Sequence, residues 1–267
     1  MKTHIPKAPV IAAWRALAAA TVALASVSAI AQGTTGLDAY VTTTFHYIDG
    51  NGQHHPSNVC ASPGGSCTSA MPYAQAQGTV VLGAANGSTA VTSIGRDGAG
   101  SGYINLHWWD TFTIVSATLP IGTPVTLHME LDMTAAVMPS IWAPSPYTRA
   151  QASLNYGGPD GPAHVFTSTQ SGSSLHSSAN LTQAVGQTLA LWGNLLMFTD
   201  TSWALGPDSG SVAASAVWRI AILEPDAAYS TASGHNYTAA VPEVPTGSLL
   251  ASGLAVLAWL ARARRRA

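Results

Sequence analysis

Apolar and polar residues alternate along two stretches of the chain. Between Val125 and Thr134, Val, Leu and Met hold the odd positions, while Thr, His, Glu and Asp hold the even ones. From Ser211 to Ile222, an apolar set that includes Trp and Ile alternates with positions that include Ser and Arg. A period of two places successive side chains on opposite faces of a strand. Each stretch therefore predicts a β-strand with one buried face and one solvent-exposed face.

Shorter stretches rich in Thr, Val, Ile and aromatic residues predict further strands. They cover residues 37–47, 78–82, 102–109, 111–119 and 187–198. Gly, Pro, Asn and Asp cluster between strands and predict turns at 49–52, 86–87, 158–161 and 206–208. No alternation of strands with helices is visible. We therefore expect residues 32–240 to form one all-β domain, an antiparallel β-sandwich with jelly-roll-like connectivity.

The first 31 residues predict an export signal. Lys2, Lys7 and Arg15 precede an uncharged run over Ala16–Ile30, which ends in a small-x-small cleavage site at Ala31. We expect the secretion translocase to export the chain and signal peptidase to remove residues 1–31. A signal helix that stays uncleaved as an anchor is the alternative.

The last 27 residues combine three features. Pro242 and Pro245 favour an extended strip over 241–245. Residues 246–261 carry no charge and predict a transmembrane helix of about 24 Å, short against a hydrocarbon core of about 30 Å. The basic tail 262–267 predicts a cytoplasmic C-terminus. Its four arginines are Arg262, Arg264, Arg265 and Arg266. An ordinary tail anchor is the alternative.

This three-part order resembles the PEP-CTERM sorting signal of Gram-negative, exopolysaccharide-producing bacteria. The motif residues are Val241, Pro242 and Glu243, and Val244 stands where the family usually has a second proline. The resemblance implies an exosortase, a membrane transpeptidase, as the partner that recognises and cleaves the strip. The chain would be its substrate, held transiently in the inner membrane and then placed at the cell surface or released.

Two segments of the middle domain resemble segments common in proteins of the same sorting class. Residues 118–127 resemble their proline, glycine, threonine, proline element before an alternating strand, and residues 229–237 resemble an element that often precedes the sorting motif. This resemblance supports a β-sandwich passenger and implies no catalytic residue.

The charge of the middle domain excludes one class of partner. Between positions 32 and 240 the chain has three arginines, no lysine and eleven carboxylates, a formal charge of −8. Such a surface repels phosphate backbones, so we expect no nucleic-acid binding.

Two groups of residues are candidates for catalysis or metal binding. Glu130 and Asp132 lie two apart on one strand face, as a glycosidase pair would, although a solvated strand surface is the simpler interpretation. His46, His54 and His55, with Asp49 nearby, have the donor types that zinc or copper prefers. Their spacing matches no known site, so we predict no metal, no cofactor and no enzymatic activity.

The cysteines and tryptophans complete the candidates. Cys60 and Cys67 flank a Pro-Gly-Gly turn, and in an exported chain this predicts a disulfide, with a free thiol as the alternative. A set of aromatic residues suggests a sugar-stacking platform or, alternatively, core and rim packing. Its members are Trp108, Trp109, Trp142, Tyr147 and Trp203. The sequence thus predicts a non-enzymatic matrix protein, with a carbohydrate-binding module of the exopolysaccharide matrix or a surface hydrolase as alternatives.

Overall fold

The described part of the chain consists of strands and their connections. The computed structural model describes residues 35–49, 52–94, 98–139, 148–156, 163–168, 173–201 and 207–238. The chain divides into two units, Met1–Gly33 and Thr34–Ala267, and every described residue belongs to the second. The strands are β1 (Thr35–Asp49), β2 (Gly52–His54), β3 (Ser57–Ser62), β4 (Ser66–Met71), β5 (Ala74–Val81), β6 (Ala84–Ile94), β7 (Ala99–Val115), β8 (Pro124–Met138), β9 (Arg149–Tyr156), β10 (Ala163–Ser168), β11 (Ser173–Ala184), β12 (Thr188–Asp200), β13 (Pro207–Ile222) and β14 (Ala228–Thr231).

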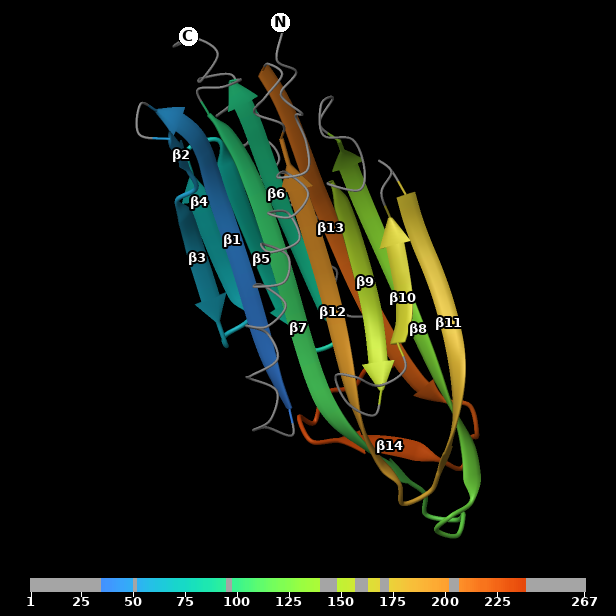
Figure 1. Ribbon diagram of the computed structural model, residues 1–267. Coiled ribbons are helices and arrows are strands. Elements are labelled where there is room, and N and C mark those ends of the chain that lie inside the picture. Colours follow the sequence, from blue (N-terminus) through green and yellow to red (C-terminus); the bar gives the residue numbers. More distant parts are fainter. Residues whose placement is uncertain are drawn as a thin grey trace, which may run out of the picture. The chain divides into compact units, whose positions relative to one another are not determined.

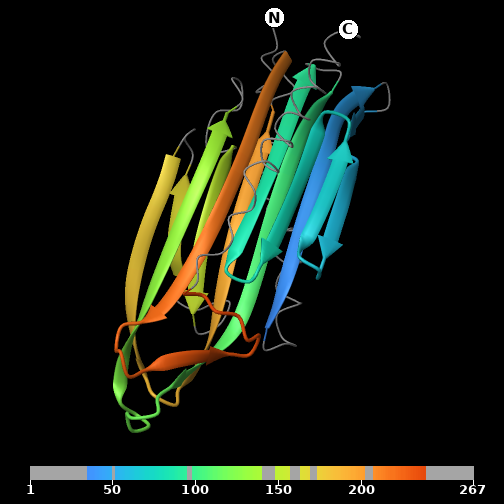
Figure 2. The same ribbon diagram turned by 180° about the vertical axis from the view of Figure 1, so that it is seen from behind.

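Hydrogen bonds join all these strands into one antiparallel sheet that is folded into two layers (Figures 1 and 2). The front layer has the order β3-β1-β7-β12-β9-β10, and β14 pairs with the end of β7. The back layer has the order β4-β5-β6-β13-β8-β11. A single pair, Ser93 with Ala99, links β6 in the back layer to β7 in the front layer. The fold is therefore all-β and sandwich-like, as the sequence predicted.

The core lies between the two layers. Every second residue of β7, β8, β12 and β13 is buried, which is the pattern that alternation in the sequence indicated. Trp108 of β7 meets Trp218 of β13 edge-on, with ring centroids 5.8 Å apart. Both rings are fully buried. Aromatic side chains of this size supply much of the apolar area that stabilises a sandwich core.

Three local predictions were wrong. Pro207 and Asp208, expected within a turn at 206–208, are the first two residues of β13. Residues 102–109 and 111–119 were expected as separate strands, but β7 runs through both from Ala99 to Val115. The turn expected at 86–87 lies inside β6. A Cβ atom at Gly87 would come within 2.4 Å of Cε of Met197, so this glycine serves close packing between the layers. The chain turns instead at Gly83, where φ is 75°.

The predicted signal peptide and sorting signal lie outside the described residues. Over the described ranges, no helix is long and apolar enough to cross a membrane.

Candidate functional site

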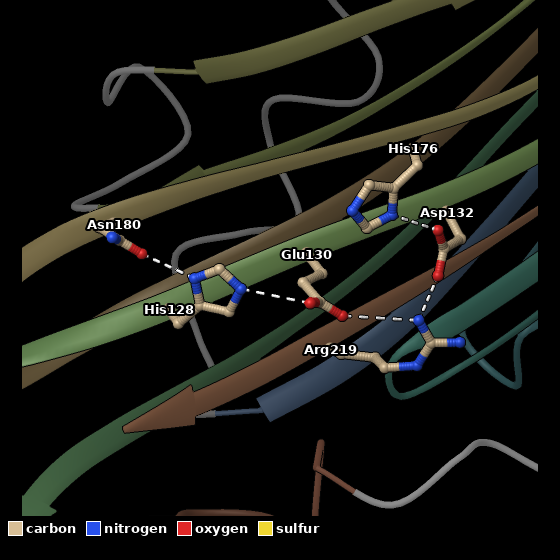
Figure 3. A network of polar contacts seen from close by, with 6 residues as sticks. All are labelled: His128, Glu130, Asp132, His176, Asn180 and Arg219. Atoms are coloured by element: carbon tan, nitrogen blue, oxygen red, sulfur yellow. Dashed lines mark hydrogen bonds and ion pairs between the residues drawn. The ribbon is translucent and has the colours of Figure 1, made fainter. Parts of the chain in front are cut away.

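A group of charged and polar side chains lies on the outer face of the back layer (Figure 3). It contains both members of the predicted carboxylate pair, Glu130 and Asp132 on β8. The antiparallel register places Arg219 of β13 opposite Glu130, and His176 of β11 opposite Asp132. His128, two residues before Glu130, faces Asn180 of β11. We call these six residues the polar network.

Arg219 joins the two carboxylates of the polar network. Its Nη1 lies 3.6 Å from Oε2 of Glu130 and donates a hydrogen bond to Oδ2 of Asp132. At one end, Nδ1 of His176 is 2.6 Å from Oδ1 of Asp132. At the other end, His128 contacts Glu130 at 3.2 Å and Oδ1 of Asn180 at 2.6 Å. Each carboxylate therefore has a cationic or imidazole partner on both sides.

These contacts set the protonation of the network. Partial burial acts to raise the pKa of Asp132, but the hydrogen bonds from His176 and Arg219 outweigh it, so the pKa is lower than usual. The hydrogen bond to Asn180 and the contact with Glu130 raise the pKa of His128 despite some desolvation. A glycosidase needs one carboxyl group with a raised pKa. Asp132 has the opposite shift.

The polar network also lacks a cleft. The cavity beside Glu130, among the described residues, has a volume of about 10 Å³ and is lined by β8, β9 and β11. That volume holds one water molecule at most. The carboxylate pair therefore gives no support to the hydrolase alternative.

The three candidate histidines do not converge on one point. Nδ1 of His46 lies 2.6 Å from Nδ1 of His55, and its Nε2 lies 3.3 Å from Oγ of Ser101. The ring of His54 stacks on Tyr47 instead. Burial and the neighbouring His55 lower the pKa of His46 to about 4. In the described ranges, no group of three or more His, Cys, Asp or Glu side chains has a geometry that would hold a metal ion.

Cys60 and Cys67 form a disulfide, with their Cα atoms 5.7 Å apart. Cys60 is on β3 in the front layer and Cys67 on β4 in the back layer. The disulfide therefore links the two layers at the edge where β3 and β4 meet.

The structure separates the candidate aromatic residues. Trp108 is completely buried in the core, so it does not belong to a sugar-stacking platform. Trp109, the next residue on β7, is partly exposed on the outer face of the front layer. Trp142, Tyr147 and Trp203 lie outside the described residues. Trp192 of β12 was missed by the sequence analysis, although it lies directly opposite Trp109.

A buried carboxylate that the sequence analysis also missed holds the end of the domain. Asp110 of β7 is 1% exposed and accepts hydrogen bonds from four donors. The donors are the Thr111 and Ser233 amides, at 2.8 and 3.2 Å, and the hydroxyls of Ser233 and Tyr237. The Tyr237 ring packs 5.0 Å from Trp108 and 4.9 Å from Phe112. Asp110 thus anchors the segment 229–237, which follows β13.

The predicted sorting motif Val241, Pro242 and Glu243 and the predicted basic tail lie outside the described residues. The buried Tyr237 is four positions before Val241.

Comparison with known proteins finds no matching family model and no matching curated protein. Among solved structures, the VP2 subviral particle of infectious bursal disease virus is similar at 9% identity, with a TM-score of 0.22 and coverage of 75% of this chain and 78% of that one. Structures of the Gx and Gt strains of this virus match at 10% identity, each with a TM-score of 0.19. The Gx match covers 76% of this chain and 78% of that one, and the Gt match 79% and 73%.

Proposed function

We propose that this chain is an exported matrix protein whose β-sandwich passenger is delivered to the cell surface by a C-terminal sorting signal. In this proposal the translocase exports the chain, signal peptidase removes residues 1–31, and residues 246–261 hold the precursor in the inner membrane. An exosortase then reads Val241, Pro242 and Glu243 and cleaves near them. The passenger itself performs no catalysis, and its connectivity is jelly-roll-like.

One observation supports this division of the chain most directly. Tyr237, close to the predicted sorting signal, is buried, and its hydroxyl donates a hydrogen bond to Asp110. The proline strip begins four residues later, at Val241. Five peptide units from Tyr237 to Pro242 reach about 17 Å when extended. The strip therefore follows the packed domain closely along the chain, and the proposal takes it to be accessible, as a protease substrate sequence should be.

The disulfide and the charge distribution support export. A disulfide between Cys60 and Cys67 is stable in an oxidising compartment and rare in the cytosol. The positive charges are concentrated in the two terminal segments, and the passenger carries a formal charge of −8. This asymmetry favours retention of both basic ends on the cytoplasmic side during export.

The test is processing of the full chain in a cell that makes an exosortase. Replacement of Pro242 and Glu243 by alanine should leave a full-length precursor in the inner membrane, while the wild type loses its C-terminal segment. Asp226→Asn removes a carboxylate upstream and serves as the matched control, which should be processed normally. Processing of the double variant at the wild-type rate would contradict the proposal.

A further inference from the structure

Two tryptophans form a pair on the outer face of the front layer. Trp109 of β7 and Trp192 of β12 are direct cross-strand partners, and both are partly exposed. On the other side of Trp109 is Gly36 of β1, where a Cβ atom would come within 2.2 Å of the indole ring. The ring therefore lies over the β1 backbone. Together the two indoles cover neighbouring strands of the front layer, which run side by side in Figure 1.

The same face carries polar atoms that have no hydrogen-bond partner in the described structure. These atoms are Thr42 Oγ1, Trp109 Nε1, Arg149 Nε, Asn155 Oδ1 and Trp192 Nε1. Asn155 of β9 is the cross-strand neighbour of Trp192, so it extends the row of two indoles. A polar group that has lost water without gaining a partner is costly, and such groups call for an explanation. These atoms are themselves buried, so a ligand on this face would satisfy them by displacing the side chains that cover them.

The adjacent row of side chains is amide-rich, and it also contains Asp38 of β1, the cross-strand neighbour of His107. Nδ2 of Asn194 donates a hydrogen bond to Oδ1 of Asn105 at 2.8 Å and lies 3.0 Å from Nδ1 of His107. Burial lowers the pKa of His107 to about 4, so this imidazole is neutral at physiological pH. The row therefore adds hydrogen-bonding groups beside the indoles, and burial raises the pKa of its one carboxyl group, Asp38.

The outer face of the back layer differs in both respects. Its charged residues pair with one another in the polar network, and its hydroxyls also bond to each other, as Thr134 does with Ser215 at 2.7 Å. Among the described residues, no unpartnered buried polar atom belongs to the polar network, whereas three lie in the row of Trp109, Trp192 and Asn155. The two faces of the sandwich offer different chemistry to a ligand.

We infer that the outer face of the front layer, centred on Trp109 and Trp192, binds a neutral polysaccharide chain. The apolar C–H face of a sugar ring packs on an indole, and its hydroxyls supply both donors and acceptors for amides and indole N–H groups. A passenger with a charge of −8 repels an acidic polymer, which favours an uncharged one. The inference rests on the proposed function in one respect only, which is that the protein encounters the polysaccharide at the cell surface.

The test measures binding by the full chain, purified in a zwitterionic detergent without a sugar headgroup. Hydroxyethyl cellulose and dextran serve as neutral polymers and alginate as an acidic one, with tryptophan fluorescence and calorimetry as readouts. We expect binding of a neutral polymer that weakens about tenfold in Trp109→Ala and in Trp192→Ala. Asn155→Ala, which keeps both rings, should weaken it about threefold. His176→Ala on the back layer is the control and should bind as the wild type does.

Several results would overturn the inference. One is a wild type that binds neither neutral polymer or binds only alginate, and another is unchanged binding in folded Trp109→Ala and Trp192→Ala variants. If either alanine variant fails to fold, Trp109→Phe and Asn155→Ala replace it, and unchanged binding in both of these variants would overturn the inference. A dimer that is lost in the tryptophan variants, without polymer binding, would assign the face to a second copy of the chain. None of these measurements involves an exosortase, so the sorting proposal and this one fail separately.

Discussion

The phenolic hydroxyl of Tyr237 donates a hydrogen bond of 3.1 Å to Oδ2 of Asp110. Among the described residues Tyr237 is the last buried side chain, and this contact joins it to β7, 127 positions earlier. The amide N–H of Tyr237 also donates to the hydroxyl of Tyr229 at 2.9 Å. Side chains thus hold the last described residues against the domain.

Replacement of Asp110 should destabilise the domain. In Asp110→Asn the amide cannot accept from all four donors, so the free energy of unfolding should fall by about 2–3 kcal/mol. Tyr237→Phe removes one donor and should cost about 1 kcal/mol. Urea unfolding followed by circular dichroism measures both. Asp226→Asn is the control and should change stability by less than about 0.5 kcal/mol. Equal stabilities of Asp110→Asn and wild type would show that the anchor contributes nothing.

Stability should fall at alkaline pH. Burial and the neighbouring Tyr40 raise the pKa of Tyr103 from 10.0 to about 12, and burial together with Asp110 raises that of Tyr237 further. Above pH 10 the unfolded chain releases phenolic protons that the folded chain keeps, so unfolding is favoured as the pH rises. The urea midpoint should therefore decrease between pH 10 and 12. Tyr103→Phe should make this decrease shallower, and an unchanged slope would contradict the assignment.

Loss of the disulfide should loosen one edge of the sandwich. Replacement of Cys60 and Cys67 by serine opens a short loop and should lower the free energy of unfolding by about 2–3 kcal/mol. Because the disulfide links β3 to β4, hydrogen exchange should accelerate most in these two strands. Exchange that increases equally in β12 and β13 would instead indicate a global effect.

Arg219 should contribute modestly and in a salt-dependent way. Arg219→Leu leaves the carboxylates of Glu130 and Asp132 without their shared cation, and the pKa of Asp132 should rise towards its usual range. These side chains are about one-third exposed, so the loss should be no more than about 1 kcal/mol and smaller at high salt. Unfolding at two ionic strengths measures it, with Arg219→Lys as the charge-preserving control. A loss independent of salt would point to packing rather than charge.

The sequence predicted the strands in which apolar and polar residues alternate most clearly. It did not predict features that depend on tertiary packing. The alternation around Glu130 and Arg219 identified β8 and β13 because one face of each is buried. Adjacent residues on a strand face opposite sides of the sheet, so one of Trp108 and Trp109 had to face the core. The local sequence does not indicate which of the two it is.

The main features of the candidate sites depend on contacts between distant residues. Trp192 meets Trp109 only through the register of β12 with β7. Asp110 is an isolated carboxylate in a Thr-rich stretch, and its donors come from residues more than 100 positions later, apart from Thr111. Asn86 and Gly87 have the local signature of a turn, but close packing against Met197 requires the glycine inside a strand. Local pattern carries none of this information.

Mass spectrometry of the mature C-terminus tests the sorting proposal most directly. The intact protein is isolated from cells with an exosortase and from otherwise identical cells without one. The proposal predicts a chain that ends near Pro242 in the first case and one that retains residues 246–267 in the second. A chain that ends at Ala267 in both strains, or near Pro242 in both, would contradict it.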